Sequence, residues 1–451
     1  MAPIKHLENT LEGLISPVAV VAKALRNSAF QHFFTKISQS GFLLLAAAVA
    51  AFVWSNLDSE GYLHFWHQEL VIGVPGFAIH HSLVHWVNEA LMAVFFLTVG
   101  LEIKREMLVG ALSDRKRAAL PLAAALGGMA FPGLIYFIFN FGADTSSGWG
   151  IPMATDIAFS LAILSTLGKR VPFGIRLFLT AFAIADDLGA ILIIAFFYTP
   201  TIELSYLAAA LGFVGCLYLL NRFWVLHILP YFMVGLLLWF ALSHSGLHAT
   251  IAGVVVAMFI PAVGRYDTNI FLKMVREKVD NMEKADGAGS SSIIVNQKHL
   301  RAVQEIELGC REVATPLQRL EHSLSSWVGF LVLPLFALAN AGVVLKSIDL
   351  SAVFFHPVTL GVAVGLALGK PMGIFSFTYL ASKLFKTDLQ QGVSWRQIFG
   401  VSCLGGIGFT MSLFISGLSF ATPAYLEYAK IGIITGSLVC GVMGYCILRR
   451  S

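Results

Sequence analysis

Long and nearly uninterrupted stretches of apolar residues dominate this sequence, and they constrain the fold more than any other feature. A transmembrane α-helix needs about 20 consecutive residues that are predominantly apolar. The stretches that approach this length are 40–55, 83–101, 118–140, 150–168, 174–198, 204–221, 226–243, 246–262, 325–342, 357–382, 396–419 and 424–447. They predict an all-α polytopic membrane protein with about twelve transmembrane helices.

The overall composition supports this prediction and excludes several other classes of protein. Only 12% of the 451 residues are charged and 57% are hydrophobic, whereas soluble domains are nearer 25% charged. The five cysteines show no paired spacing, so neither a disulfide framework nor a zinc site is expected. The net charge of +4 comes from basic residues that flank the spans, so the expected surroundings are membrane lipid and not nucleic acid.

The positions of Lys and Arg predict how the spans are oriented. Of the 30 basic residues, 27 fall in the two terminal segments and in the connections that alternating spans place on one side. The exceptions are Lys346, Lys370 and Lys430. Because cytoplasmic loops carry the excess of Lys and Arg, we expect both termini in the cytoplasm, which requires an even number of spans.

The predicted spans and their orientation divide the chain into four parts. Residues 1–39 form an amphipathic cytoplasmic segment, 40–262 carry helices one to eight, 263–322 form a polar cytoplasmic insertion, and 323–448 carry helices nine to twelve. The outer loop 56–82 has a loosely alternating apolar pattern and the turn residues Pro75-Gly76, so a short β-hairpin is expected there.

A few ionisable residues lie inside the predicted spans, although nearly all of the 26 acidic residues lie in loops. Asp186 and Asp187 are central in 174–198, Asp156 lies in 150–168, and Lys370 is central in 357–382. Such residues are costly in a membrane and indicate function by default. Two buried carboxylates with a lysine can exchange protons; the alternative is a structural ion pair, which adds little to stability.

Two of the spans contain residues that interrupt helices. Gly150 and Pro152 open one span and precede Thr155-Asp156, and the other carries the sequence GGIGFT at 405–410. Interrupted spans in corresponding positions of two halves indicate a transporter binding site. Helix N-termini carry partial positive charge and C-termini partial negative charge, so Asp156 is expected to balance the former and Lys370 the latter. Close helix packing is the alternative explanation for the glycines.

At this point the sequence resembles the NhaA-type sodium/proton antiporters of bacteria. The matching stretches cover most of the membrane part, 40–262 and 317–448. They are NEALMAVFFLTVGLEIKRE (88–106), IPMATDIAFSLAILSTLGKRVP (151–172), AIADDLGAILIIAFFYT (183–199), SGLHATIAG (245–253), LPLFALANAGV (333–343), GKPMGI (369–374) and GGIGFTMSLFIS (405–416).

The resemblance implies a fold and a set of residue roles. The fold has twelve helices, of which three to five and ten to twelve form inverted repeats with two interrupted helices. The ion-binding and proton-carrying residues would be Asp186, Asp187, Thr155 and Asp156, with Lys370 and Asp156 balancing charge. The resemblance also implies a homodimer through the outer loop, 60–80. Positions linked to the pH response are Glu102, Arg105, Glu106, His248 and Glu321.

The resulting prediction is a secondary transporter, not an enzyme, in the bacterial inner (plasma) membrane. It would exchange cytoplasmic Na⁺ or Li⁺ for external H⁺ without a cofactor, electrogenically and under pH control, for sodium and pH homeostasis. Asp186, Asp187 and Thr155 are the predicted sodium ligands, because a hard cation takes oxygen ligands. Two alternatives stay open: a passive cation channel, which lines its pore by symmetric repetition, and an intramembrane aspartyl protease, which places its aspartates on two helices.

Overall fold

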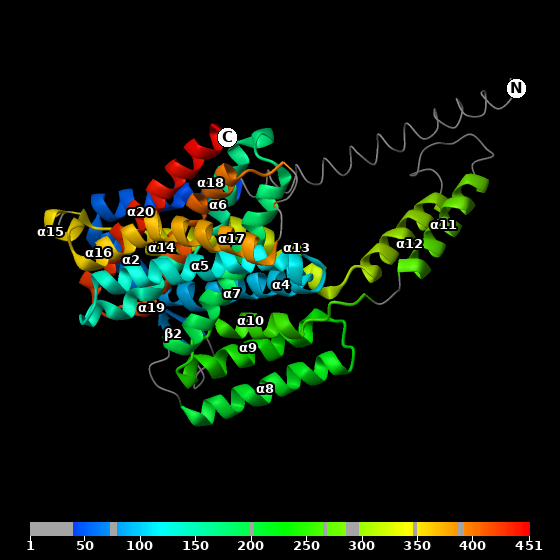
Figure 1. Cartoon of the computed structure of the whole chain (residues 1–451). Coiled ribbons are helices and arrows are strands. Elements are labelled where there is room, and N and C mark those ends of the chain that lie inside the picture. Colours follow the sequence, from blue (N-terminus) through cyan, green and yellow to red (C-terminus); the bar gives the residue numbers. More distant parts are fainter. Residues whose placement is uncertain are drawn as a thin grey trace, which may run out of the picture. The chain divides into compact units, whose positions relative to one another are not determined.

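A computed structural model describes residues 39–72, 79–198, 203–264, 268–285, 297–345, 350–386, 389 and 392–451 (Figure 1). The predicted amphipathic segment 1–39 therefore lies outside the described residues, except for its last position. The chain divides into two compact units. The first comprises 1–59, 123–183 and 340–451, and the second comprises 60–122 and 184–339. The boundaries fall within two long helices, α5 (Arg115–Phe139) and α7 (Phe173–Phe197).

The described residues of the first unit are helical apart from short connections. They begin with the helix Gln39–Leu57 and include the first-unit parts of α5 and α7. The further elements are η2 (Asp144–Met153), α6 (Ile157–Thr166), η3 (Gly168–Arg170), α15 (Leu350–Phe354), α16 (Pro357–Val364), η6 (Gly365–Gly369), α17 (Lys370–Phe385), α18 (Trp395–Gly405), α19 (Phe409–Ser419) and α20 (Pro423–Arg449).

The described residues of the second unit combine helices with one small sheet. Its elements, besides its parts of α5 and α7, are α2 (Ser59–His67), β1 (Glu69–Ile72), β2 (Ile79–Ser82), α3 (Leu83–Trp86), η1 (Val87–Leu91), α4 (Met92–Val109), α8 (Leu204–Arg222), α9 (Ile228–Ser245), α10 (Ile251–Phe259), α11 (Thr268–Ala285), α12 (Gln297–Val313), α13 (Pro316–Trp327), η4 (Val328–Val332) and α14 (Leu333–Asn340).

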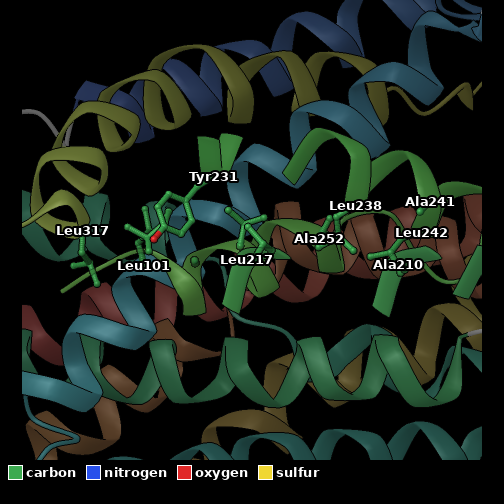
Figure 2. Packing of buried hydrophobic residues seen from close by; sticks show 12 residues of the cluster. Leu101, Ala210, Leu217, Tyr231, Leu238, Ala241, Leu242, Ala252 and Leu317 are labelled. Atoms are coloured by element: carbon green, nitrogen blue, oxygen red, sulfur yellow. The ribbon is translucent and has the colours of Figure 1, made fainter. Parts of the chain in front are cut away.

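The helices of the second unit pack around a cluster of buried apolar residues. Helices α8, α9 and α10 lie side by side in Figure 1, and α10 also packs along α4. Figure 2 shows Leu217 of α8, Tyr231 and Leu238 of α9, and Ala252 of α10 in this cluster. Gly253 allows the close approach of α10 to α4, because a Cβ there would lie 2.7 Å from the backbone nitrogen of Leu97.

The segment 56–82 is partly helical and partly a β-hairpin. Helix α2 occupies its first half, and β1 and β2 then pair antiparallel, with Glu69 opposite Ser82 and Ile72 opposite Ile79. The predicted turn at Pro75-Gly76 lies outside the described residues. In the polar insertion, α11 and α12 form an antiparallel pair, visible in Figure 1, which the ion pair between Lys278 and Glu305 joins at 2.5 Å.

Within the described ranges, ten helical segments are long and apolar enough to cross a membrane, or eleven if the bent pair α18–α19 counts as one span. These eleven correspond to eleven of the twelve predicted spans. The remaining one, 246–262, contains only the nine-residue helix α10, preceded by a turn. Gly246 ends α9 in the left-handed conformation, with φ of 85°, so α9 does not continue into this stretch.

Paired glycines bring two helices of the first unit into backbone contact. Gly127 of α5 and Gly373 of α17 face one another, and a Cβ on either residue would overlap the carbonyl oxygen of the other. Lipid tails are as apolar as leucine, so association of membrane helices depends on such close packing.

Gly373→Ala is therefore expected to destabilise the protein by about 3 kcal/mol, because the added methyl group forces α5 and α17 apart. Thermal unfolding in detergent measures the effect. Gly417→Ala is the matched control, since a Cβ at Gly417 of α19 meets no atom within 4 Å. Equal unfolding temperatures for the two variants would contradict this account of the packing.

Candidate functional site

The first interrupted segment changes from 3₁₀ helix to extended chain and back to α-helix. Element η2 ends at Met153, residues 154–156 are extended, and α6 begins at Ile157. Pro152 contributes to this break, since proline has no backbone N–H to donate and its ring disfavours a continuing helix. Residues 150–156, which contain the break, are all buried.

The second interrupted segment breaks between α18 and α19, whose axes differ by 43°. Gly406 and Gly408 fill the break. A Cβ on Gly406 would lie 2.7 Å from the carbonyl oxygen of Leu366, so only glycine fits the backbone there. At the start of α19, the hydroxyl of Ser437 in α20 accepts hydrogen bonds from the backbone N–H groups of Gly408 and Phe409, each at 3.2 Å.

Asp156 joins the two breaks, because its carboxylate caps the helix N-termini on both sides. Its Oδ1 accepts from the backbone N–H of Phe159 in α6 at 3.0 Å. Its Oδ2 accepts from the backbone N–H of Thr410 in α19 at 3.1 Å and from the Thr410 hydroxyl at 2.6 Å. The backbone N–H of Asp156 donates to the carbonyl of Ile407 at 2.7 Å. A negative charge thus lies where two helices present partial positive charge.

Two other side chains donate hydrogen bonds to carbonyl oxygens at the C-terminal ends of the interrupted helices. The ammonium of Lys370 donates to the carbonyl oxygen of Met153, the last residue of η2. The hydroxyl of Thr155 donates to the carbonyl oxygen of Gly405, the last residue of α18, at 2.9 Å. Lys370 is fully buried and directly follows the π-helical turn η6. The first unit therefore brings Thr155, Asp156 and Lys370 together where the two interrupted segments cross, called the crossing below. There the Lys370 ammonium and the Thr155 hydroxyl donate to carbonyls at helix C-terminal ends, and the Asp156 carboxylate accepts from N–H groups at N-terminal ends.

Sequence reasoning gave no role to the hydroxyl groups that complete this crossing. Thr410 donates to Asp156, and Ser437 holds the start of α19. Ser412 donates to the carbonyl of Ile151 at 2.7 Å and Ser160 to that of Leu404 at 2.8 Å. The sequence did mark Thr410, because it lies two residues after the glycine cluster that ends at Gly408. Ser437 lies in an unbroken apolar helix far along the sequence, so nothing in the sequence singled it out.

Asp186 and Asp187 lie in the middle of α7, which runs from Phe173 to Phe197. The structure assigns both residues to the second unit. Each is only 1% exposed. Because adjacent helical residues point about 100° apart, the two carboxylates face different surroundings. In the described ranges, no group of three or more His, Cys, Asp or Glu side chains is arranged to hold a metal ion, so these carboxylates would need other oxygen atoms to coordinate a cation.

The second unit brings together most of the residues predicted for the pH response. The guanidinium of Arg105 in α4 contacts the carboxylate of Glu321 in α13 at 2.6 Å and that of Glu106 at 3.1 Å. The other oxygen of Glu106 accepts from the backbone N–H of Ala111 at 2.8 Å. Glu102 lies one helical turn before Glu106 on α4. These four residues, Glu102, Arg105, Glu106 and Glu321, are called the Arg105 cluster below.

His248 does not belong to the Arg105 cluster. It lies in the turn before α10, and its Nε2 is 2.8 Å from the carbonyl oxygen of Tyr198, so Nε2 carries the proton that is donated. The acidic residue that acts on it electrostatically is Glu89, which lies in η1 at the opposite end of α4 from the Arg105 cluster. The predicted pH-response residues therefore occupy two separate places.

Comparison with known proteins decides the family. The sequence profile described as Na⁺/H⁺ antiporter 1 matches residues 31–448. The chain belongs to this family. A Na(+)/H(+) antiporter NhaA of Oleidesulfovibrio alaskensis is 45% identical over 421 residues, which covers 93% of each chain. One from Helicobacter pylori strain G27 is 45% identical over 407 residues, 89% of this chain and 91% of the relative. The antiporter is thus a multi-pass membrane transporter with the NhaA fold and not an enzyme.

Proposed function

We propose that the antiporter exchanges Na⁺, or Li⁺, for H⁺ across the inner membrane of a bacterium, with Asp186 and Asp187 as the groups that carry both. The observation that carries this proposal is an adjacent pair of carboxylates, each 1% exposed, at the centre of a 25-residue membrane helix. Family membership supplies the ions, since the related proteins are named for Na⁺ and H⁺.

Competition for the same carboxylates gives the exchange. A protonated aspartate is neutral and attracts no sodium, whereas an ionised aspartate is an oxygen ligand that suits a hard cation. Sodium and protons therefore displace one another, and the rate depends on pH without a separate sensor. The role of Thr155 as a neutral oxygen ligand stays a prediction from the sequence; its hydroxyl donates to Gly405 and keeps lone pairs that can accept.

The crossing in the first unit has a different proposed role. Asp156 accepts three hydrogen bonds from groups at two helix N-termini, and Lys370 donates to a C-terminal carbonyl. These contacts support a charge-balancing role for both residues: opposite side-chain charges offset the helix-end dipoles where the backbone is interrupted in the membrane. Asp156 is therefore a better candidate for holding the crossing than for binding sodium directly.

Transport in reconstituted vesicles tests the function. Purified protein is placed in vesicles, external sodium is added, and internal pH is followed with a fluorescent dye. If more than one proton is exchanged for each sodium, the exchange moves net charge and an imposed membrane potential changes its rate. Sodium flux without counter-movement of protons would support a channel and would contradict the proposal. An exchange rate that does not change with the imposed potential would contradict only the claim that the exchange moves net charge.

The Arg105 cluster is proposed to set the pH response. Arg105 is shared between two acidic partners from α4 and α13, so the three groups act as one unit. Residues in one ion-pair network have non-additive effects. We therefore expect Arg105→Gln and Glu321→Gln each to shift the pH of half-maximal exchange, and the double variant to shift it no further. Arg222→Gln, at the end of α8, is the control and should leave the pH profile in place; fully additive shifts would contradict a single unit.

The β-hairpin is proposed to form a homodimer. The apolar side chains of Leu70, Val71 and Ile72 on β1 are all exposed, and an exposed apolar edge strand is a template for pairing with a second chain. Replacing 69–82 by a short polar linker is expected to give monomers in detergent while exchange in vesicles persists. Size-exclusion chromatography with light scattering measures the mass; an unchanged dimer content would discard this proposal.

The orientation is proposed from the charge distribution. The 27 Lys and Arg residues of the terminal segments and alternate connections favour cytoplasmic termini. With that orientation, the hairpin 69–82 lies on the external side, and the Arg105 cluster lies toward the cytoplasm.

A further inference from the structure

The first unit contains an apolar crevice of about 540 Å³ that no part of the proposed transport mechanism uses. Its walls come from the helix Gln39–Leu57, from α6, from α20 and from the break between α18 and α19. The residues that line it are almost all apolar: Leu45, Ala48, Val49, Phe52, Phe159, Ile163, Thr166, Ala341, Ile407, Phe409, Ile434, Ser437, Leu438, Gly441, Val442 and Tyr445. Its volume is within the usual range for sites that hold small ligands.

The crevice runs from an exposed rim to a buried floor. Val49 of the first helix and Leu438 and Val442 of α20 form the rim and are more than half exposed, on helices long and apolar enough to cross a membrane. Ile407 and Phe409 form the floor and are buried beside the break that starts α19. In a bilayer, the rim therefore faces the hydrocarbon tails of lipids. A molecule that enters the crevice from that side contacts the residues of the helix break.

One end of the crevice has basic residues beside it. Thr166 and Tyr445 are the lining residues nearest to the C-terminal ends of α6 and α20. Arg449 lies one helical turn beyond Tyr445 on the same face of α20, and Arg170 follows shortly after α6 ends at Thr166. Both arginines are exposed. The crevice thus has a basic end and an apolar body, which is the charge pattern of a site for an anionic lipid.

We propose that this crevice binds one acyl chain of an anionic phospholipid, whose phosphate group lies at Arg170 and Arg449. Arginine suits phosphate because its planar guanidinium can donate two parallel hydrogen bonds. The acyl chain lies against Ile407 and Phe409, next to the Ser437 hydroxyl that holds the start of α19. Bound lipid therefore supports the interrupted helix beside Ile407 and Phe409, and it stabilises the first unit.

Native mass spectrometry of the purified full chain in detergent tests this site. Phosphatidylglycerol and phosphatidylcholine with identical acyl chains are titrated separately, and the affinity for one bound lipid is measured. We expect the wild type to prefer phosphatidylglycerol by about tenfold, since each basic residue near a phosphate attracts an anionic lipid. We also expect affinity to rise with acyl length up to the length that the crevice accommodates, because each added methylene makes further packing contacts with the crevice walls.

Two pairs of variants separate the chain site from the phosphate site. Val442→Trp places a large ring in the crevice and should weaken binding of both lipids by about tenfold or more, because the ring occupies space that the acyl chain would fill. Val439→Trp, also exposed on α20 but outside the crevice, should leave affinity unchanged. Arg170→Gln with Arg449→Gln should remove the preference for phosphatidylglycerol while chain-length dependence persists, and Arg222→Gln should keep the preference.

Several results would overturn the proposal. Equal losses of affinity in Val442→Trp and Val439→Trp would show that the crevice does not hold the chain. A preference for phosphatidylglycerol that survives loss of both arginines would place the phosphate elsewhere. A wild-type affinity that does not depend on acyl length would exclude a chain site, and this outcome needs no variant to fold.

Discussion

Asp187→Asn is expected to abolish sodium-driven proton movement in reconstituted vesicles, and Asp186→Asn is expected to do the same. An amide has the shape of the carboxylate but neither its charge nor its exchangeable proton. Both aspartates are buried at the centre of α7, so bulk water offers no substitute ligand or proton carrier there. The measurement is the change in internal pH after a sodium pulse, with equal amounts of correctly folded protein in the vesicles.

The matched control for this prediction is Asp144→Asn. This variant makes the same chemical change, from carboxylate to amide, but at an exposed position at the start of η2. It should retain exchange at the wild-type rate. Loss of exchange in this control as well would show that the assay responds to any change of charge, and retained exchange in Asp187→Asn would contradict the proposed role of the pair.

Asp156→Ala should cause the largest loss of stability among substitutions at the crossing. It removes the acceptor for the backbone N–H groups of Phe159 and Thr410 and for the Thr410 hydroxyl. Each buried donor left unsatisfied costs about 1–3 kcal/mol, so the three together approach the whole stability of a typical domain. Thermal unfolding in detergent should show a fall of many degrees, and exchange should be lost with the fold.

Two further variants sharpen this test. Asp156→Asn retains one acceptor oxygen, so it should lie between the wild type and Asp156→Ala in stability and should impair exchange less than Asp187→Asn. Asp114→Ala is the control, because Asp114 also accepts from a backbone N–H at a helix start, that of Lys116 at 3.1 Å, but in an exposed position. A similar fall in Asp114→Ala and Asp156→Ala would contradict the special role of the crossing.

Much of this arrangement was predictable from the sequence, because a membrane leaves few options for an apolar chain. Ten of the apolar stretches correspond to single segments that can span a bilayer, and GGIGFT at 405–410 corresponds to the bent pair α18–α19. The break before α6 was indicated by Pro152 with its neighbouring glycines. The ionisable residues were conspicuous for the same physical reason: Asp156, Asp186, Asp187 and Lys370 are charged groups in otherwise apolar segments, and all four are buried.

Other features depended on contacts between segments far apart in the sequence. The stretch 246–262 is apolar except for His248 and Thr250, and hydropathy alone does not distinguish a spanning helix from a turn followed by the short α10. Helix α2 lies in a segment that was predicted as a loop, since its nine residues are too few to show a clear period. The sharing of one carboxylate between α6 and α19 could not be predicted in detail, because it depends on how two breaks cross whose residues Asp156 and Thr410 are 254 positions apart.

The roles of the site residues remain predictions, and one equilibrium measurement tests the central one directly. Sodium is added to the purified antiporter in weakly buffered detergent solution at alkaline pH, and released protons are counted with a pH indicator. The account predicts proton release on addition of Na⁺ or Li⁺ but not of a bulky organic cation, and no release from Asp186→Asn or Asp187→Asn. Release at the wild-type level from Asp187→Asn would contradict the claim that sodium and protons compete for this pair.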